Sequence, residues 1–121
     1  MKILIVEDDK DMSWIWNEEL KAKKYTVKIA EDGERALDLA RSFMPELIIL
    51  DLILPKKDGM TVLQELKADP VTKNIVVIVS SNLGGDETIK KALALGAADY
   101  FAKAQHPIYE IIDKAQKYIT K

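Results

Sequence analysis

Three short runs of branched apolar residues constrain most strongly how this chain can fold. They are Ile3–Val6, Leu47–Leu50 and Ile75–Val79, and polar or turn-forming residues bound each of them. Runs of four or five such residues are typical of strands that are buried on both faces. The chain therefore predicts a parallel sheet that is covered by helices on both sides.

Two weaker strands complete this pattern, Tyr25–Ile29 with alternating polarity and Tyr100–Ala102. Amphipathic helical patterns fill the intervals, with apolar positions Met12, Ile15, Trp16 and Leu20; Ala36, Leu37, Ala40 and Met44; Leu63 and Leu66; Ile89, Ala92 and Leu93; and Ile108, Ile111, Ile112, Ala115 and Ile119. Strand and helix alternate five times, which requires right-handed crossovers between parallel strands. The prediction is one α/β domain over residues 1–121, a flavodoxin-like doubly wound (βα)5 three-layer sandwich with strand order 2-1-3-4-5.

Composition excludes several classes of protein. The 121 residues carry a formal net charge of −2 and no cysteine. The near-neutral charge and the lack of a basic run argue against a protein that coats nucleic acid. Without cysteine, there is no thiol for a disulfide, a zinc site or catalysis. No apolar run approaches the length of a membrane span. We expect a cytoplasmic domain that neither inserts into a membrane nor binds nucleic acid directly.

Acidic residues follow two of the predicted central strands. Glu7 and Asp8 come after the first apolar run, and Asp51 comes directly after the second. In an open parallel sheet, ligands bind beyond the carboxyl ends of the strands where the strand order reverses, and these three carboxylates meet there. A cluster of like charges without histidine or cysteine favours a hard cation, Mg²⁺ before Ca²⁺ or Mn²⁺.

Two further strand ends add a hydroxyl and a cation to this cluster. Ser80 and Ser81 follow the fourth predicted strand, and Lys103 follows the fifth. No base lies near the serines in the sequence, so a hydrolase triad is disfavoured. We expect Asp51 to be the nucleophile, with Mg²⁺ and Lys103 neutralising phosphoryl oxygens and a serine hydroxyl donating a hydrogen bond.

The motifs that contain these residues, taken in order, resemble those of response-regulator receiver domains of two-component signalling, of the stand-alone chemotaxis-Y-like kind. They are Ile-Leu-Ile-Val-Glu7-Asp8-Asp9, Asp51-Leu-Ile-Leu-Pro55-Lys-Lys-Asp58-Gly59, Ser80-Ser81, and Gly96-Ala-Ala-Asp-Tyr100-Phe-Ala-Lys103. The resemblance extends over the whole chain. It implies a switch that undergoes self-catalysed phosphoryl uptake and slow autodephosphorylation and does not turn over a metabolite.

The resemblance also implies a role for each matching residue. Asp51 would accept a phosphoryl group from a histidine kinase or phosphotransfer protein, and the downstream protein target is left unnamed. Asp8, Asp51 and the backbone carbonyl of Ile53 would bind Mg²⁺, or Mn²⁺, directly, and Glu7 would bind it through water. Ser80 would be the switch hydroxyl, Tyr100 the aromatic side chain that turns inward on activation, and Lys103 the lysine of the site. Asp9 is expected to be an acid at a helix N-terminus.

One position departs from the family pattern. Receiver domains usually have a cis Lys-Pro bond where this chain has Lys103–Ala104. A cis bond before alanine costs about 2.5–4 kcal/mol, so we expect this bond to be trans. His106, which precedes Pro107, is expected to be a residue at a helix start, with no role as a phosphate donor or a ligand.

The kinase is expected to dock near the site. Trp14 lies off the apolar stripe of its helix, and with the loop from Ala104 to Pro107 it would form the docking surface. Trp16 is expected in the core, and Tyr109 lies off the apolar stripe of its own helix.

Three other functions share parts of this pattern. A flavodoxin-like FMN carrier is rejected, because Glu7 and Asp8 would repel the phosphate of the cofactor. A haloacid-dehalogenase-type phosphohydrolase needs Asp-x-Asp, whereas Ile53 lies two residues after Asp51. A degenerate receiver that only binds proteins is disfavoured, because all the acceptor-site residue types are present.

Overall fold

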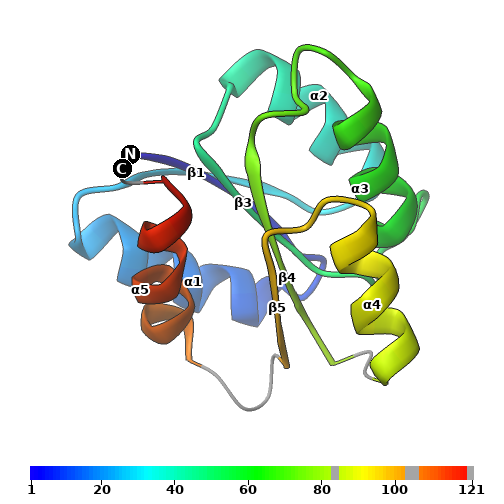
Figure 1. Cartoon of the computed structure of the whole chain (residues 1–121). Coiled ribbons are helices and arrows are strands. Elements are labelled where there is room, and N and C mark those ends of the chain that lie inside the picture. The colour runs from blue at the N-terminus through cyan, green and yellow to red at the C-terminus, as the bar shows by residue number, and fades with distance from the viewer. Residues whose placement is uncertain (83–84, 103–106, 120–121) are drawn as a thin grey trace.

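The computed structural model describes residues 1–82, 85–102 and 107–119. Strand and helix alternate along these residues as predicted (Figure 1). The strands are β1 (Lys2–Val6), β2 (Thr26–Ala30), β3 (Leu47–Leu50), β4 (Val76–Ser81) and β5 (Asp99–Ala102). The helices are α1 (Lys10–Ala22), α2 (Gly33–Phe43), α3 (Gly59–Ala68), α4 (Asp86–Ala94) and α5 (Ile108–Ile119).

The strands form one parallel sheet in the order β2-β1-β3-β4-β5. Helices α1 and α5 cover one face of it, and α2, α3 and α4 cover the other (Figure 1). The flavodoxin-like three-layer fold is therefore confirmed. Of the described helices, none is long and apolar enough to cross a bilayer.

Burial along the strands agrees with the apolar runs. Every residue of β3 is buried, and in β1 only Lys2 is exposed. Strand β2, at the sheet edge, alternates between exposed and half-buried positions before Ala30. Branched side chains of the central strands therefore fill two cores, one under each helical layer.

Three apolar residues that were expected in the core are instead exposed. Ile15 and Leu93 project from α1 and α4 because Trp16, Leu20 and Ala92 provide the buried positions of those helices. Met44 is also exposed, because its backbone takes the left-handed conformation (φ 50°, ψ 60°) that ends α2.

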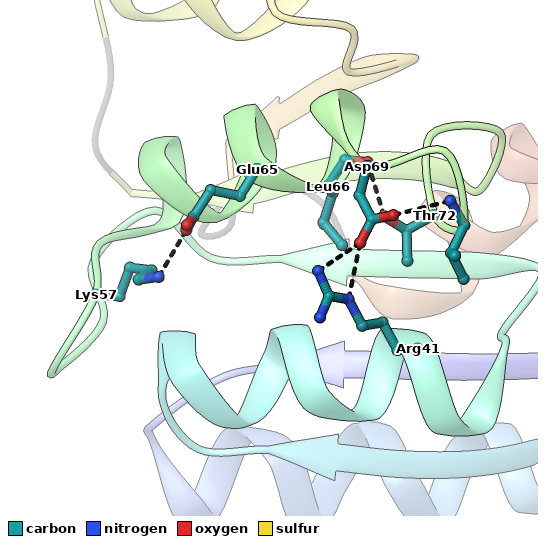
Figure 2. A network of polar contacts seen from close by, with 7 residues as sticks. Arg41, Lys57, Glu65, Leu66, Asp69 and Thr72 are labelled. Carbon is teal, nitrogen blue, oxygen red and sulfur yellow. Dashed lines mark hydrogen bonds and ion pairs between the residues drawn. The ribbon is translucent and has the colours of Figure 1, made fainter.

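A polar network fastens α2 to the end of α3 (Figure 2). Arg41 of α2 contacts Asp69 Oδ2 through both Nε (2.7 Å) and Nη2 (2.6 Å). The hydrogen bond from the Val71 N–H is the main cause that holds the pKa of Asp69 below its usual range, and the hydrogen bond and ion pair with Arg41 lower it further. The buried Thr72 hydroxyl donates to the Leu66 carbonyl oxygen (2.8 Å), which closes the turn. These contacts lie far from the acidic cluster and hold the helical layer in place.

Candidate phosphorylation site

The acidic cluster forms because two strands end side by side. Val6 and Leu50 are paired in the sheet, so Glu7 and Asp51 emerge from adjacent strands at the same edge. The Asp51 N–H donates to the Val6 carbonyl oxygen (3.1 Å), which fixes this alignment. One carboxylate oxygen from each of Glu7, Asp8 and Asp51 lies within 4.8 Å of the others. The structure thus brings together the three carboxylates that the sequence singles out.

Burial makes this cluster suited to a cation. Glu7 is 1% exposed and Asp51 is 7% exposed, whereas Asp8 is open to solvent. Buried carboxylates repel each other strongly, because little water screens their charges. Oxygen ligands with one open side are the coordination that Mg²⁺ or Mn²⁺ prefers. The residues present therefore fit a hard divalent cation.

Asp9 has a structural role beside the cluster. Its Oδ1 accepts hydrogen bonds from the backbone N–H groups of Asp11 (2.9 Å) and Met12 (3.2 Å), so it caps α1. Its own N–H donates to Glu7 Oε2 (3.2 Å). The prediction that Asp9 is a helix N-terminal acid is confirmed, and the turn it forms also orients Glu7.

The hydroxyl beside Asp51 belongs to Ser81, and this corrects the expectation for Ser80. Ser81 Oγ donates to Asp51 Oδ1 (2.9 Å) in a buried hydrogen bond. Ser80 is fully buried, and its Oγ has no hydrogen-bond partner among the described residues. Successive side chains of a strand point to opposite faces, so only one of two adjacent serines can reach the acceptor.

Substitution of the two serines by alanine should affect stability differently. Ser81→Ala removes a buried hydrogen bond to a carboxylate and should lower the free energy of unfolding by about 1.5–3 kcal/mol. Ser80→Ala removes an unsatisfied buried hydroxyl and should leave that free energy unchanged or raise it. Urea unfolding of both variants measures the difference. A larger loss for Ser80→Ala would contradict the hydrogen bonding described here.

Tyr100 already lies near the acceptor. It is half-buried against the core under α2, α3 and α4. Burial is the main cause that raises the pKa of its phenol, the negative charge of Asp51 raises it further, and a side-chain hydrogen bond with Ser81 lowers it. Asp51, Ser81 and Tyr100 are thus connected in one chain of polar contacts. The prediction that Tyr100 turns inward on activation stays a prediction.

The loop after Asp51 is held close to it. The Ile53 N–H donates to Asp51 Oδ1 (3.2 Å), while the Ile53 side chain is exposed. Asp58 caps α3 by accepting from the Thr61 N–H (2.9 Å), which lowers the pKa of Asp58. The Gly59 N–H donates to the Leu52 carbonyl oxygen (2.9 Å), and a Cβ on Gly59 would overlap the backbone of Asp51 and Leu52. Gly59 is thus required by this close approach of the backbone, since its φ is not in the positive region.

Several predicted residues lie outside the described part of the chain. They are Lys103, Ala104 and His106, together with the Lys103–Ala104 bond. Pro107 is described and exposed, directly before α5. The predictions for Lys103, for its peptide bond and for His106 therefore stay predictions.

Exposed apolar side chains lie on elements next to the cluster. Trp14, on the second turn of α1, is 63% exposed, and Ile15 and Ile53 are also exposed. Trp16 is buried between α1 and the sheet, as expected. Tyr109, near the start of α5, is exposed too.

Comparisons with known proteins agree with this geometry. A family model for the response regulator receiver domain matches residues 3–116. Sporulation initiation phosphotransferase F of Bacillus subtilis (strain 168) is 35% identical over 118 residues, which are 98% of this chain and 93% of that protein. Response regulator PleD of Caulobacter vibrioides (strain NA1000 / CB15N) is 36% identical over 102 residues, which are 84% of this chain and 22% of PleD. The chain thus spans only about a fifth of the length of PleD.

Solved structures show the same fold. The BeF3-activated N-terminal receiver domain of Klebsiella pneumoniae RstA superposes with a TM-score of 0.89 at 26% identity, covering 100% of both chains. The Mn(2+)-bound form of response regulator Rcp1 superposes with a TM-score of 0.83 at 29% identity, covering 99% of this chain and 95% of that one.

Receiver domains bind Mg²⁺ through an acidic cluster, and they interact with histidine kinases or phosphotransfer proteins. The cluster of Glu7, Asp8 and Asp51 fits such a phosphorylation site. This chain belongs to the response regulator receiver domains of two-component signalling, which are phosphorylation-controlled switches.

Proposed function

We propose that Asp51 of this receiver domain accepts the phosphoryl group. The observation that carries the proposal is the position of its carboxylate. It is buried beside Glu7 and Asp8, and its Oδ1 accepts hydrogen bonds from Ser81 and from the Ile53 N–H. Asp8 is exposed and accepts no such hydrogen bond from the residues that the structure describes, so Asp51 is the better-oriented nucleophile.

The transfer needs few groups. A carboxylate oxygen of Asp51 forms a bond to phosphorus while the bond from phosphorus to the donor's histidine nitrogen breaks. The bonding electron pair stays on that nitrogen. Ser81 Oγ is within reach to donate a hydrogen bond to a phosphoryl oxygen, because it already donates to Asp51. Lys103 is proposed to neutralise another phosphoryl oxygen from the end of β5.

The metal ligands proposed are Asp8, Asp51 and the backbone carbonyl of Ile53, with Glu7 acting through a bound water. Glu7 is oriented for this role by the hydrogen bond from the Asp9 N–H. When bound, Mg²⁺ or Mn²⁺ supplies positive charge that offsets the repulsion between these carboxylates and an incoming phosphate. Activity would be limited to phosphoryl uptake and slow autodephosphorylation, without turnover of a metabolite.

The switch proposed runs through Ser81 and Tyr100. Phosphorylation changes the charge and the position of the group that Ser81 contacts, and the hydrogen bond between Ser81 and Tyr100 passes this change to β5. The surface formed by α4, β5 and α5 would then change its affinity for a downstream protein. In the cytoplasm, a histidine kinase or phosphotransfer protein would supply the phosphoryl group.

Removal of the metal tests the proposed site. Incubation with acetyl phosphate and Mg²⁺ should add one phosphoryl group to the intact chain. With EDTA the yield should fall to background, because the carboxylates repel the phosphate, and excess Mg²⁺ or Mn²⁺ should restore it. Intact-mass spectrometry measures the yield. Equal labelling in EDTA and in Mg²⁺ would refute the metal-dependent site.

A further inference from the structure

The turn between β2 and α2 touches the loop that follows Asp51, although the two segments are far apart in sequence. The Gly33 N–H, at the first position of α2, lies 3.4 Å from the Pro55 carbonyl oxygen and donates to it. Asp32 caps the same helix through Oδ1, and its Oδ2 lies 3.7 Å from Lys56 Nζ. One helix start thus holds two consecutive residues of the loop.

Gly33 leaves no space for a side chain. A Cβ there would overlap the Lys57 carbonyl oxygen and would lie 2.7 Å from Lys57 Cβ and 2.8 Å from its carbonyl carbon. The backbone of Gly33 is not in the positive-φ region, where Gly85 and Gly96 are found. Alanine would therefore suit this helix position by conformation, and only the contact with the loop excludes it.

The loop is held firmly on its other side. Lys57 Nζ pairs with Glu65 Oε2 of α3 (2.7 Å), as Figure 2 shows. The Lys57 N–H donates to the Pro55 carbonyl oxygen (2.7 Å), which makes a tight turn, and Lys56 has a φ of 66°. Pro55–Lys57 thus form one hydrogen-bonded turn that begins two residues after Ile53, so a displacement of Lys57 also displaces Pro55.

We propose that Gly33 is a positioning residue for the phosphorylation site. By allowing the start of α2 to pack directly on Pro55–Lys57, it sets where the Ile53 carbonyl lies relative to Asp51. The proposal rests on the proposed function, in which that carbonyl is a metal ligand. The contacts that carry this role are those of Gly33 with Pro55 and Lys57.

The variant Gly33→Ala tests this role. Its Cβ must push the loop by roughly 1 Å to reach ordinary van der Waals distance. We expect Mg²⁺ affinity, measured by isothermal titration calorimetry, to fall about 10- to 100-fold, as when an outer contact of a metal ligand is lost. Labelling by acetyl phosphate should fall at low Mg²⁺ and recover at saturating Mg²⁺. Unchanged Mg²⁺ affinity with a lower melting temperature would overturn the proposal, because that result indicates a structural role only.

Glu34→Ala is the matched control. Glu34 is the next residue of α2 and is exposed, so the same new side chain there meets no loop. Its Mg²⁺ affinity should equal that of the unchanged chain. An equal loss in both variants would contradict the proposal, because a general change in α2 would then explain the effect.

A measurement on the unchanged chain tests the same proposal even if the Gly33→Ala variant does not fold. In an NMR titration, the amide signal of Gly33 should shift with the same Mg²⁺ dependence as the signals of the acidic loops, whereas that of Gly96 should not move. A Gly33 signal that stays in place at saturating Mg²⁺ would overturn the proposal. Failure of the proposed function is a separate result, in which Mg²⁺ binds but acetyl phosphate labels no aspartate.

Discussion

Asp51→Asn is expected to abolish phosphoryl uptake. Asparagine keeps the size of the side chain and can still accept the hydrogen bonds from Ser81 and from the Ile53 N–H. It lacks the anionic oxygen that attacks phosphorus, and it removes one charge from the metal cluster. Intact-mass spectrometry with acetyl phosphate and Mg²⁺ should therefore show no adduct on this variant.

Asp58→Asn is the control for that substitution. Asp58 lies in the same loop, and its carboxylate caps α3 away from the metal cluster. Asparagine is also a good helix cap, so the fold should be kept. This variant should be labelled as the unchanged chain is. A phosphoryl adduct on Asp51→Asn in the same yield as on the unchanged chain would contradict the assignment of Asp51 as the acceptor.

Trp14→Ala should slow phosphoryl transfer from a histidine kinase by about 30-fold or more. Exposed tryptophans are frequent hot spots of interfaces, where truncation costs about 2 kcal/mol or more. Trp14 is exposed on the second turn of α1, and that helix begins beside the acidic cluster. Labelling by acetyl phosphate should stay unchanged, because a small donor needs no docking surface. Radiolabel transfer from a purified kinase that labels the unchanged chain measures the first rate.

Leu93→Ala is the matched control for Trp14. Leu93 is also an exposed apolar side chain, but it lies near the end of α4. Its truncation should leave transfer from the kinase at the rate of the unchanged chain. Equal losses for Trp14→Ala with the kinase and with acetyl phosphate would mean that Trp14 supports the fold.

The fold could be predicted from the sequence because its strands are buried on both faces. Such strands, Leu47–Leu50 above all, appear as uninterrupted apolar runs, and the alternating Tyr25–Ile29 pattern indicates the sheet edge. The switch in strand order then brings Glu7 and Asp51 to one place without any knowledge of side-chain positions.

The choice between Ser80 and Ser81 could not be made in the same way. Both are buried serines at the end of β4, and because they are adjacent and identical the sequence does not distinguish them. Which hydroxyl faces Asp51 depends on how Asp51 turns once β3 has ended, and a one-residue difference reverses the face. Only the hydrogen bond from Ser81 decides it.

The contact between Gly33 and the loop after Asp51 is also absent from any local pattern. It joins the first residue of α2 to a loop that is distant in sequence, and their approach depends on how α2 packs against the sheet and α3. Glycine is common near helix N-termini, so a glycine at that position in a sequence does not by itself indicate a steric requirement. Its steric requirement is visible only when Lys57 is placed beside it.

The central claim is that Asp51 carries the phosphoryl group, and chemical trapping tests it most directly. Borohydride reduces an acyl phosphate and so marks the carboxyl group that carried it. After labelling with acetyl phosphate and Mg²⁺, peptide sequencing by tandem mass spectrometry should find the reduced residue at position 51 alone. A mark on Asp8 or on Asp9, with Asp51 unmodified, would contradict the account.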